Sequence, residues 1–141
     1  MLFRSSETAD IIAAAHGLPA PLLHPGLRER NYGEAEGTSS LEFVERYGPG
    51  HDAVVPGAET VEEVRDRAIM AINEIVKVAR RMTAPETPHV IAVAHGALIG
   101  TVLRHVSGGT VPAPGTRVEN GSAHTLLVEQ DNLTLLDYAT V

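Results

Sequence analysis

Residues 89–106, HVIAVAHGALIGTVLRHV, constrain the fold more than any other stretch because they join an apolar run, a polar turn and a helical pattern. The short apolar run at 90–94 predicts a strand buried on both faces of a parallel sheet. After it, apolar residues recur at the spacing of one helix face, at Leu98, Val102, Leu103 and Val106. The order strand, turn, helix therefore predicts an α/β fold.

His95 and Gly96 occupy the turn of this unit. Ligands of open α/β sheets bind at the carboxyl ends of the strands, and a helix N-terminus presents free N–H groups and a partial positive charge. His95 would therefore lie where a phosphate or carboxylate is held, and Gly96 would keep side-chain bulk away. The alternative is that His95 only ends the helix by donating to a backbone carbonyl.

Composition restricts the function classes. The 141 residues suit one domain, residues 1–141, and the net charge of −7 argues against a nucleic-acid partner. The absence of cysteine excludes a disulfide framework and thiolate chemistry. No apolar run approaches the roughly 20 residues of a membrane span, and the N-terminus lacks the pattern of a signal peptide. A cytoplasmic protein without membrane contact is expected.

Local signals predict the remaining elements. Residues 2–16 are rich in alanine and predict a helix, and a polar connection with three glycines follows at 22–38. Two capping boxes predict helices, Ser39 with Glu42 for a short one to about Tyr47, and Thr60 with Glu63 for a long one over about 60–82. The long helix has one apolar stripe, and its other face carries charged residues that include Arg67. A β-hairpin is expected from strands at 123–129 and 133–138.

Charged residues in two places fit phosphoryl chemistry. Arg28, Glu29 and Arg30 are consecutive in the long connection, and Arg4 lies on the first helix. Arginine binds phosphate through a bidentate fork, and a carboxyl group near a phosphate can donate its proton to a leaving alkoxide. The alternative is that these residues are solvated surface charges.

Five segments, in chain order, resemble motifs of the histidine phosphatase superfamily, in its phosphoglycerate mutase-like branch. They are RSSETA at 4–9, LRERNYGEAEG at 27–37, GAET at 57–60, VAHG at 93–96, and Asn120 with the hairpin after it. The resemblance implies an α/β fold, a three-layer sandwich with a mostly parallel sheet flanked by helices and a C-terminal hairpin. It covers nearly the whole chain.

The resemblance also implies roles for single residues. His95 would contact the transferred phosphoryl group, and Glu29 would be the general acid and later the base that activates water. The residues implied to bind phosphate or substrate are Arg4, Arg30, Tyr32, Gly96 and Glu59. Glu59 is also an alternative acid, and Glu36 and Gly37 are expected to be structural.

The sequence departs from the family pattern in one respect. Family members begin with a strand that carries Arg-His-Gly, whose histidine is phosphorylated, and this chain contains no Arg-His-Gly. His16 and Gly17 follow an alanine-rich helix and cannot replace it. The first strand of the family fold is therefore expected to be missing. Three accounts remain: a truncated record of a phosphatase, a short relative that binds phosphorylated ligands without turnover, or His95 as a substitute nucleophile.

The expected activity is hydrolysis of a small-molecule phosphate monoester through a phosphohistidine in the complete family member, with this chain inactive as written. Phosphoglycerate mutase-type transfer is the alternative, although only residues 38–59 separate Gly37 from Thr60 and the mutases carry a long insertion there. A non-catalytic phospho-ligand module is a further alternative. Neither cofactor nor metal is expected, because the histidines show no His-Glu-x-x-His spacing and the glycine pattern is too sparse for a dinucleotide. Assembly as a homo-oligomer is left open.

Overall fold

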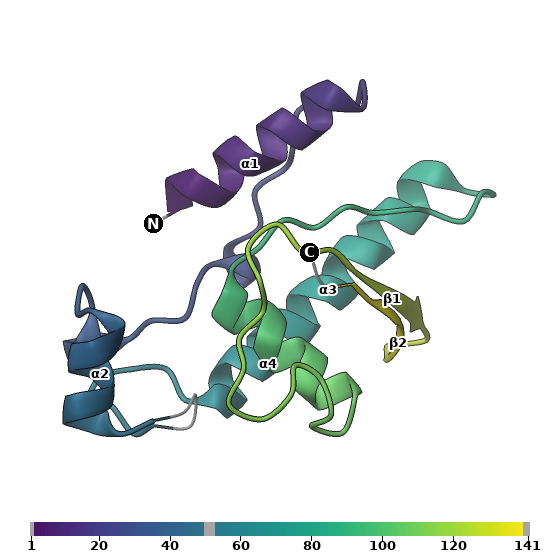
Figure 1. Cartoon of the computed structure of the whole chain (residues 1–141). Coiled ribbons are helices and arrows are strands. Elements are labelled where there is room, and N and C mark those ends of the chain that lie inside the picture. The colour runs from purple at the N-terminus through teal and green to yellow at the C-terminus, as the bar shows by residue number, and fades with distance from the viewer. Residues whose placement is uncertain (1, 50–52, 140–141) are drawn as a thin grey trace.

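The computed structural model describes residues 2–49 and 53–139, and Figure 1 shows the arrangement of their elements. The helices are α1 (Leu2–Ala15), α2 (Ser40–Tyr47), α3 (Val61–Thr83) and α4 (Gly96–Val106), the two 3-10 turns are η1 (Pro25–Leu27) and η2 (Gly33–Ala35), and the strands are β1 (His124–Glu129) and β2 (Asn132–Tyr138). The four α-helices and the hairpin lie where the sequence predicts them, with ends that differ by one residue or so.

Both capping boxes are formed and fix where α2 and α3 begin. The Ser39 hydroxyl accepts from the amide of Glu42, whose carboxylate accepts from the amide of Ser39 in return. Thr60 and Glu63 make the same reciprocal pair, at 3.1 and 2.8 Å. Each pair satisfies amides that the first helical turn leaves without intrahelical partners. The start of α3 thereby fixes the position of Glu59, the residue just before the cap.

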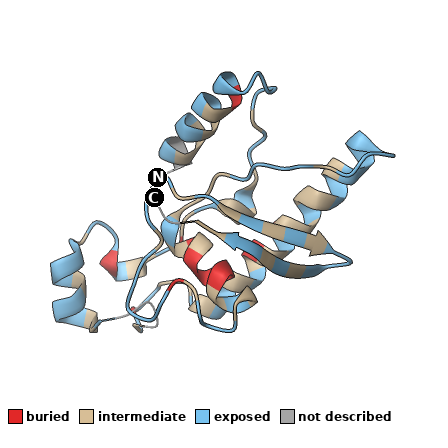
Figure 2. Cartoon of the chain, turned by 45° about the vertical axis from the view of Figure 1, so that its right-hand side comes forward, coloured by how far each residue is buried: buried red, intermediate tan, exposed pale blue. Residues whose placement is uncertain are grey.

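The core lies where α3 packs on α4. Val64 and Ala68 of α3 are buried against Leu98 and Val102 of α4. The hairpin covers this pair of helices through Leu126 and Leu133, among other partly buried apolar residues. Figure 2 shows the buried residues concentrated on the helices at the centre, whereas the hairpin and α1 carry mostly intermediate and exposed residues.

The hairpin is antiparallel, with Leu126 opposite Leu135 and Glu129 opposite Asn132. Its two-residue turn, Gln130 and Asp131, has positive φ angles of 48° and 68°. Positive φ at both central positions is the geometry of a type I′ turn, whose twist matches that of the flanking strands. Burial alternates along β1, so one face of the hairpin is directed to the helices.

The predicted strand at 89–94 is wrong. Residues 87–95 have no regular secondary structure, and the side chains of Val90 and Ile91 are 44% and 59% exposed rather than buried. A strand exists only if a neighbouring strand accepts and donates its ladder hydrogen bonds, and no such neighbour lies beside this segment among residues 2–49 and 53–139. The apolar run carries the β propensity, but it has no pairing partner.

The chain is therefore of mixed α and β structure, with one two-stranded antiparallel sheet in the described part. The expected three-layer sandwich with a mostly parallel sheet is not observed there. Both views show α1 standing apart from α3, α4 and the hairpin. Within the described residues, no helix combines the length and the apolar character that a membrane crossing requires.

Candidate active site

Two glycines dock the connection that carries Glu29. A Cβ added to Gly26 would lie 2.5 Å from the Cβ of Ala71, so the backbone touches α3 there. Gly33 has φ +55°, and a Cβ on it would lie 2.3 Å from the carbonyl oxygen of Pro56. Only glycine permits such close approaches, and at Gly33 the positive φ favours glycine as well. The segment between these two glycines is therefore pressed against α3 and against residues 56–58.

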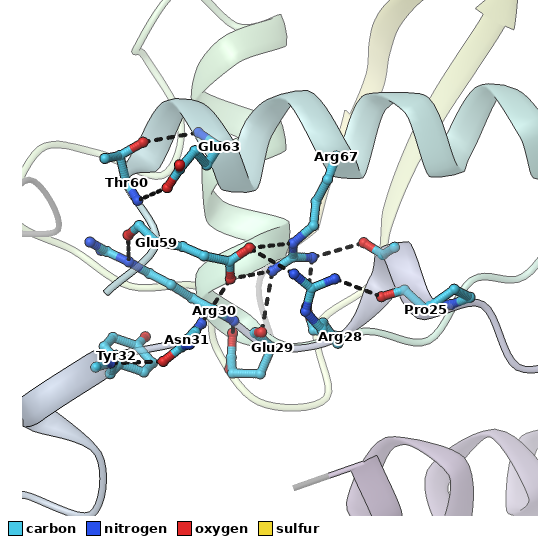
Figure 3. A network of polar contacts seen from close by, with 12 residues as sticks. Pro25, Arg28, Glu29, Arg30, Asn31, Tyr32, Glu59, Thr60, Glu63 and Arg67 are labelled. Carbon is cyan, nitrogen blue, oxygen red and sulfur yellow. Dashed lines mark hydrogen bonds and ion pairs between the residues drawn. The ribbon is translucent and has the colours of Figure 1, made fainter. Parts of the chain in front are cut away.

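The carboxylate of Glu59 binds this segment and holds it in place. The two oxygens of Glu59 accept four hydrogen bonds, from Nε and Nη2 of Arg67, from Nη2 of Arg28 and from the backbone amide of Asn31, at 2.8 to 3.0 Å. Figure 3 shows the Glu59 carboxylate facing the Arg67 guanidinium. The Arg67 hydrogen bonds above all, together with the Asn31 amide and the Arg28 charge, lower the pKa of Glu59 to about 2 although burial opposes them.

Arg67 also binds the segment directly. Its Nη1 donates to the carbonyl oxygens of Gly26 and Arg28, and its Nη2 donates to that of Glu29. The side chains of Arg67 and Glu59 are each only 15% exposed. One guanidinium therefore satisfies three backbone carbonyls and one carboxylate, which suits the planar fork of arginine and not the single charge of lysine.

Glu29 and His95 meet at the end of this network. The Glu29 Oε1 accepts from the amide of Arg30 at 2.9 Å, and its Oε2 lies 3.9 Å from Nδ1 of His95. Their side chains are 20% and 13% exposed. The carboxylate and the imidazole thus face each other at a distance longer than a hydrogen bond, and one oxygen of Glu29 remains directed towards His95. The contact joins residues from opposite halves of the chain.

Arg30 and Tyr32 lie in the same segment, beside Glu29. Arg30 is 8% exposed, its Nε donates to the carbonyl oxygen of Glu59, and its guanidinium lies 5.5 Å from the centre of the Tyr32 ring. Tyr32 also packs edge-on against Phe43. Burial first, and then the charge of Glu29, raise the pKa of Tyr32, so its hydroxyl keeps its proton and remains a donor at neutral pH.

The N-terminus of α4 is open beside His95. His95 is the N-cap residue but its side chain makes no capping hydrogen bond, and its backbone is extended with φ −116°. Gly96 is exposed, and a Cβ added there would meet nothing within 4 Å. The alternative was that the imidazole only ends the helix by donating to a backbone carbonyl, and no such hydrogen bond is present among the described residues. First-turn amides next to an imidazole can hold an oxyanion.

Arg4 does not contact Glu29 or His95. Its side chain is exposed on α1, and its carbonyl oxygen accepts from the Thr8 hydroxyl at 3.0 Å within the helix. No hydrogen bond or ion pair between its guanidinium and either Glu29 or His95 is found in the part of the chain that the structure describes. Apart from Arg4, the structure thus places the predicted site residues close together: Glu29, Arg30, Tyr32 and Glu59 contact one another, and His95, with Gly96 next to it, lies 3.9 Å from Glu29. The roles of all seven residues stay predictions.

The sequence interpretation missed Arg67, which it assigned to the solvent face of the long helix. The signal was available, because Arg67 lies three residues after Val64 and four before Ala71, both of which are buried. Those steps place it at the border of the apolar stripe. A guanidinium that is turned towards the protein from such a border needs hydrogen-bond acceptors there.

Comparison with known proteins supports the motif-based reading. The sequence pattern that defines the histidine phosphatase superfamily (branch 1) matches residues 1–140. The uncharacterized phosphatase PhoE of Bacillus subtilis (strain 168) is 31% identical over 137 residues, which are 97% of this chain and 66% of PhoE. A 2,3-bisphosphoglycerate-dependent phosphoglycerate mutase of Cytophaga hutchinsonii is 28% identical over 115 residues, 75% of this chain and 52% of the mutase. The chain thus spans between about half and two thirds of these relatives.

Two solved structures share the fold. A protein described as mycobacterial hydrolase 1 superposes with a TM-score of 0.73 at 20% identity, covering 96% of this chain and 70% of the hydrolase. A mycobacterial glucosyl-3-phosphoglycerate phosphatase, in complex with inorganic phosphate, superposes with a TM-score of 0.71 at 18% identity, covering 96% and 72%. At these identities the likeness is one of fold.

Proposed function

The chain belongs to the histidine phosphatase superfamily, and we propose that the wall formed by Glu29, His95 and the start of α4 binds the phosphoryl group of a small phosphate monoester. The observation that carries the proposal is the 3.9 Å approach of Glu29 Oε2 to His95 Nδ1 at an open helix N-terminus. It places a carboxyl group beside oxyanion donors, and phosphoryl transfer needs a group that can exchange protons as well as such donors.

In the complete family member, as the resemblance implies, the histidine of Arg-His-Gly attacks phosphorus and forms a P–N bond as the bond to the ester oxygen breaks, and the residues of this chain would act around that step. The imidazole of His95 and the first amides of α4 hold the oxygens of the phosphoryl group as negative charge develops on them. Glu29, in its protonated form, gives its proton to the leaving oxygen of the ester, and its carboxylate later accepts a proton from the attacking water. Arg30 and Tyr32 contact the substrate, and Arg4 would complete the phosphate clamp.

The nucleophile of the family is the histidine of Arg-His-Gly, and residues 1–141 contain no such motif. We therefore propose that these residues alone bind phosphate without hydrolysing esters. Phosphoglycerate mutase-type transfer remains the second candidate, favoured by the 28% identity to a mutase. The short spacing between Gly37 and Thr60 argues for the phosphatase.

Binding of orthovanadate, followed by calorimetry, tests the proposal. Replacing His95 by alanine should weaken the affinity by about tenfold or more, because a hydrogen bond to a charged group contributes about 1.5–3 kcal/mol. His89→Ala is the matched control, since His89 is exposed near the same segment, and it should bind as the wild type does. Equal affinity of His95→Ala and wild type would contradict the proposed site.

Hydrolysis of p-nitrophenyl phosphate separates the alternatives for the nucleophile. Residues 1–141 should show no turnover above that of His95→Ala. Turnover that is lost in His95→Ala and accompanied by an acid-labile phosphohistidine would instead identify His95 as a substitute nucleophile.

A further inference from the structure

The two carboxylates near the site have different surroundings. Within the part of the chain that the structure describes, Glu29 accepts one hydrogen bond, from the next amide in the chain, and directs its other oxygen to His95. Both oxygens of Glu59 are fully engaged by four donors, three of them on guanidinium groups. A carboxylate with two cationic partners and a backbone amide is held in its ionised form, so it has no proton to give.

We propose that Glu59 and Arg67 form a positioning pair that holds residues 26–31 in the conformation in which the Glu29 carboxylate lies against His95. Neither member of the pair exchanges a proton with the substrate. The inference rests on the proposed function for the role of Glu29, and it removes Glu59 as an alternative acid.

The connectivity of Arg67 shows how the pair acts. Its guanidinium binds the carbonyl oxygens of Gly26, Arg28 and Glu29. It therefore holds the backbone before Glu29 and at Glu29 itself. Glu59 holds the next step, because its Oε2 accepts from the Asn31 amide and its own amide donates to the Asn31 carbonyl at 2.9 Å. The residue that carries the proposed acid is thus fixed from both sides.

The rigid part of this arrangement is α3. Arg67 lies between the buried Val64 and Ala71, and Glu59 directly precedes the Thr60 cap. The network therefore ties an irregular segment to the longest helix of the chain. A lysine at position 67 would keep the charge but could not bind a carboxylate and three carbonyls at once.

The conservative variant Arg67→Lys tests the pair, with Arg65→Lys as the matched control. Arg65 lies on the same helix and pairs with its neighbour Asp66 at the surface. We expect Arg67→Lys to fold and to shift the NMR signals of the His95 ring nitrogens in the same direction as Glu29→Gln does. Arg65→Lys should leave those signals unchanged. Unchanged His95 signals in folded Arg67→Lys would overturn the proposal.

Orthovanadate affinity gives the second measurement. Arg67→Lys should bind vanadate about tenfold more weakly than the wild type, because Glu29 would no longer lie against the His95 imidazole and loss of one hydrogen bond to a charged group lowers affinity by about that factor. Arg65→Lys should bind vanadate as the wild type does. A lower melting temperature together with wild-type vanadate affinity would show a merely structural role and would overturn the inference. If the wild type itself binds no vanadate, the proposed function fails, whereas the His95 signals still decide the inference.

A titration of the Glu59 carboxyl carbon by NMR addresses the excluded acid. In the wild type its midpoint should lie near 2, and in Arg67→Lys it should rise because the best of its partners is lost. A wild-type midpoint near neutral pH would make Glu59 a competent acid and would contradict the proposal.

Discussion

Residues 26–31 carry Glu29 and are tied to α3 by side-chain hydrogen bonds, whereas residues 87–95 carry His95 and reach it without regular secondary structure. The first segment has an arginine and a carboxylate that satisfy its backbone groups. Among residues 2–49 and 53–139, the backbone of residues 87–94 has no backbone hydrogen-bond partner, and the carbonyl oxygen of His95 accepts the first hydrogen bond of α4. The comparison teaches that His95 is fixed mainly from the helix that follows it, and Glu29 from a network around it.

Removing the centre of the network should have the largest effect. Arg67→Leu leaves the Glu59 carboxylate and three carbonyls without their main donor, and a buried charge that loses its partner typically costs about 3 to 5 kcal/mol. We expect a loss of about 3 kcal/mol in the free energy of unfolding, measured by urea denaturation.

Arg65→Leu is the control for this prediction. Arg65 pairs with Asp66 on the exposed side of the same helix, and such pairs contribute between about 0 and 1 kcal/mol. Equal losses in the two variants would mean that the network does not hold the Glu29 segment more firmly than a surface ion pair would.

Acid should weaken the network that holds residues 26–31. Because the pKa of Glu59 in the folded chain is about 2, below the roughly 4.3 of an unfolded glutamate, its stabilisation is complete above pH 5 and is lost as the pH falls towards 2. A pKa difference between roughly 4.3 and about 2 corresponds to about 3 kcal/mol, and screening by solvent reduces the expected contribution of this group to about 2 kcal/mol. Chemical denaturation at several pH values should show a smaller decline in Glu59→Gln than in the wild type, and an equal decline would contradict the assignment.

The sequence predicted the elements whose signals are local. Both capping boxes lie at the start of the helices that they specify, the apolar stripe lies within α3, and the hairpin turn lies between its two strands. The strand expected at 89–94 failed for the opposite reason. Its apolar residues indicate β structure, but pairing depends on a distant strand, which the run itself cannot specify.

In the candidate site, too, some residues could be predicted from the sequence and one was missed. Family motifs selected Glu29 and His95, and the structure places them 3.9 Å apart. The position of Arg67 beside the apolar stripe could be seen from the sequence, and Glu59 lies only eight residues before it. Its other acceptors could not be seen, because they are backbone carbonyl oxygens 38 to 41 residues earlier in the chain. Backbone carbonyls carry no sequence signal, so only coordinates show that a helix arginine binds them.

Amide hydrogen exchange compares the two segments without any substitution. The Asn31 amide donates to the Glu59 carboxylate and the Glu59 amide donates to the Asn31 carbonyl oxygen, at 2.9 Å each. Both amides should therefore be protected from exchange. The amides of residues 90–94 have no acceptor among the described residues and should exchange at least about tenfold faster. Protection of both segments to the same degree, measured by NMR, would remove the contrast.

The smallest effect is expected from a charge on the second segment. Ile91 is 59% exposed, so Ile91→Asp should cost less than about 0.5 kcal/mol in the free energy of unfolding. Val64→Asp is the control, because Val64 is fully buried between α3 and α4 and a lone charge there should unfold the chain. If Ile91→Asp costs 2 kcal/mol or more, a surface in solution covers residues 90–94. His95 would then be held from both sides, as Glu29 is, and the difference between the two segments would disappear.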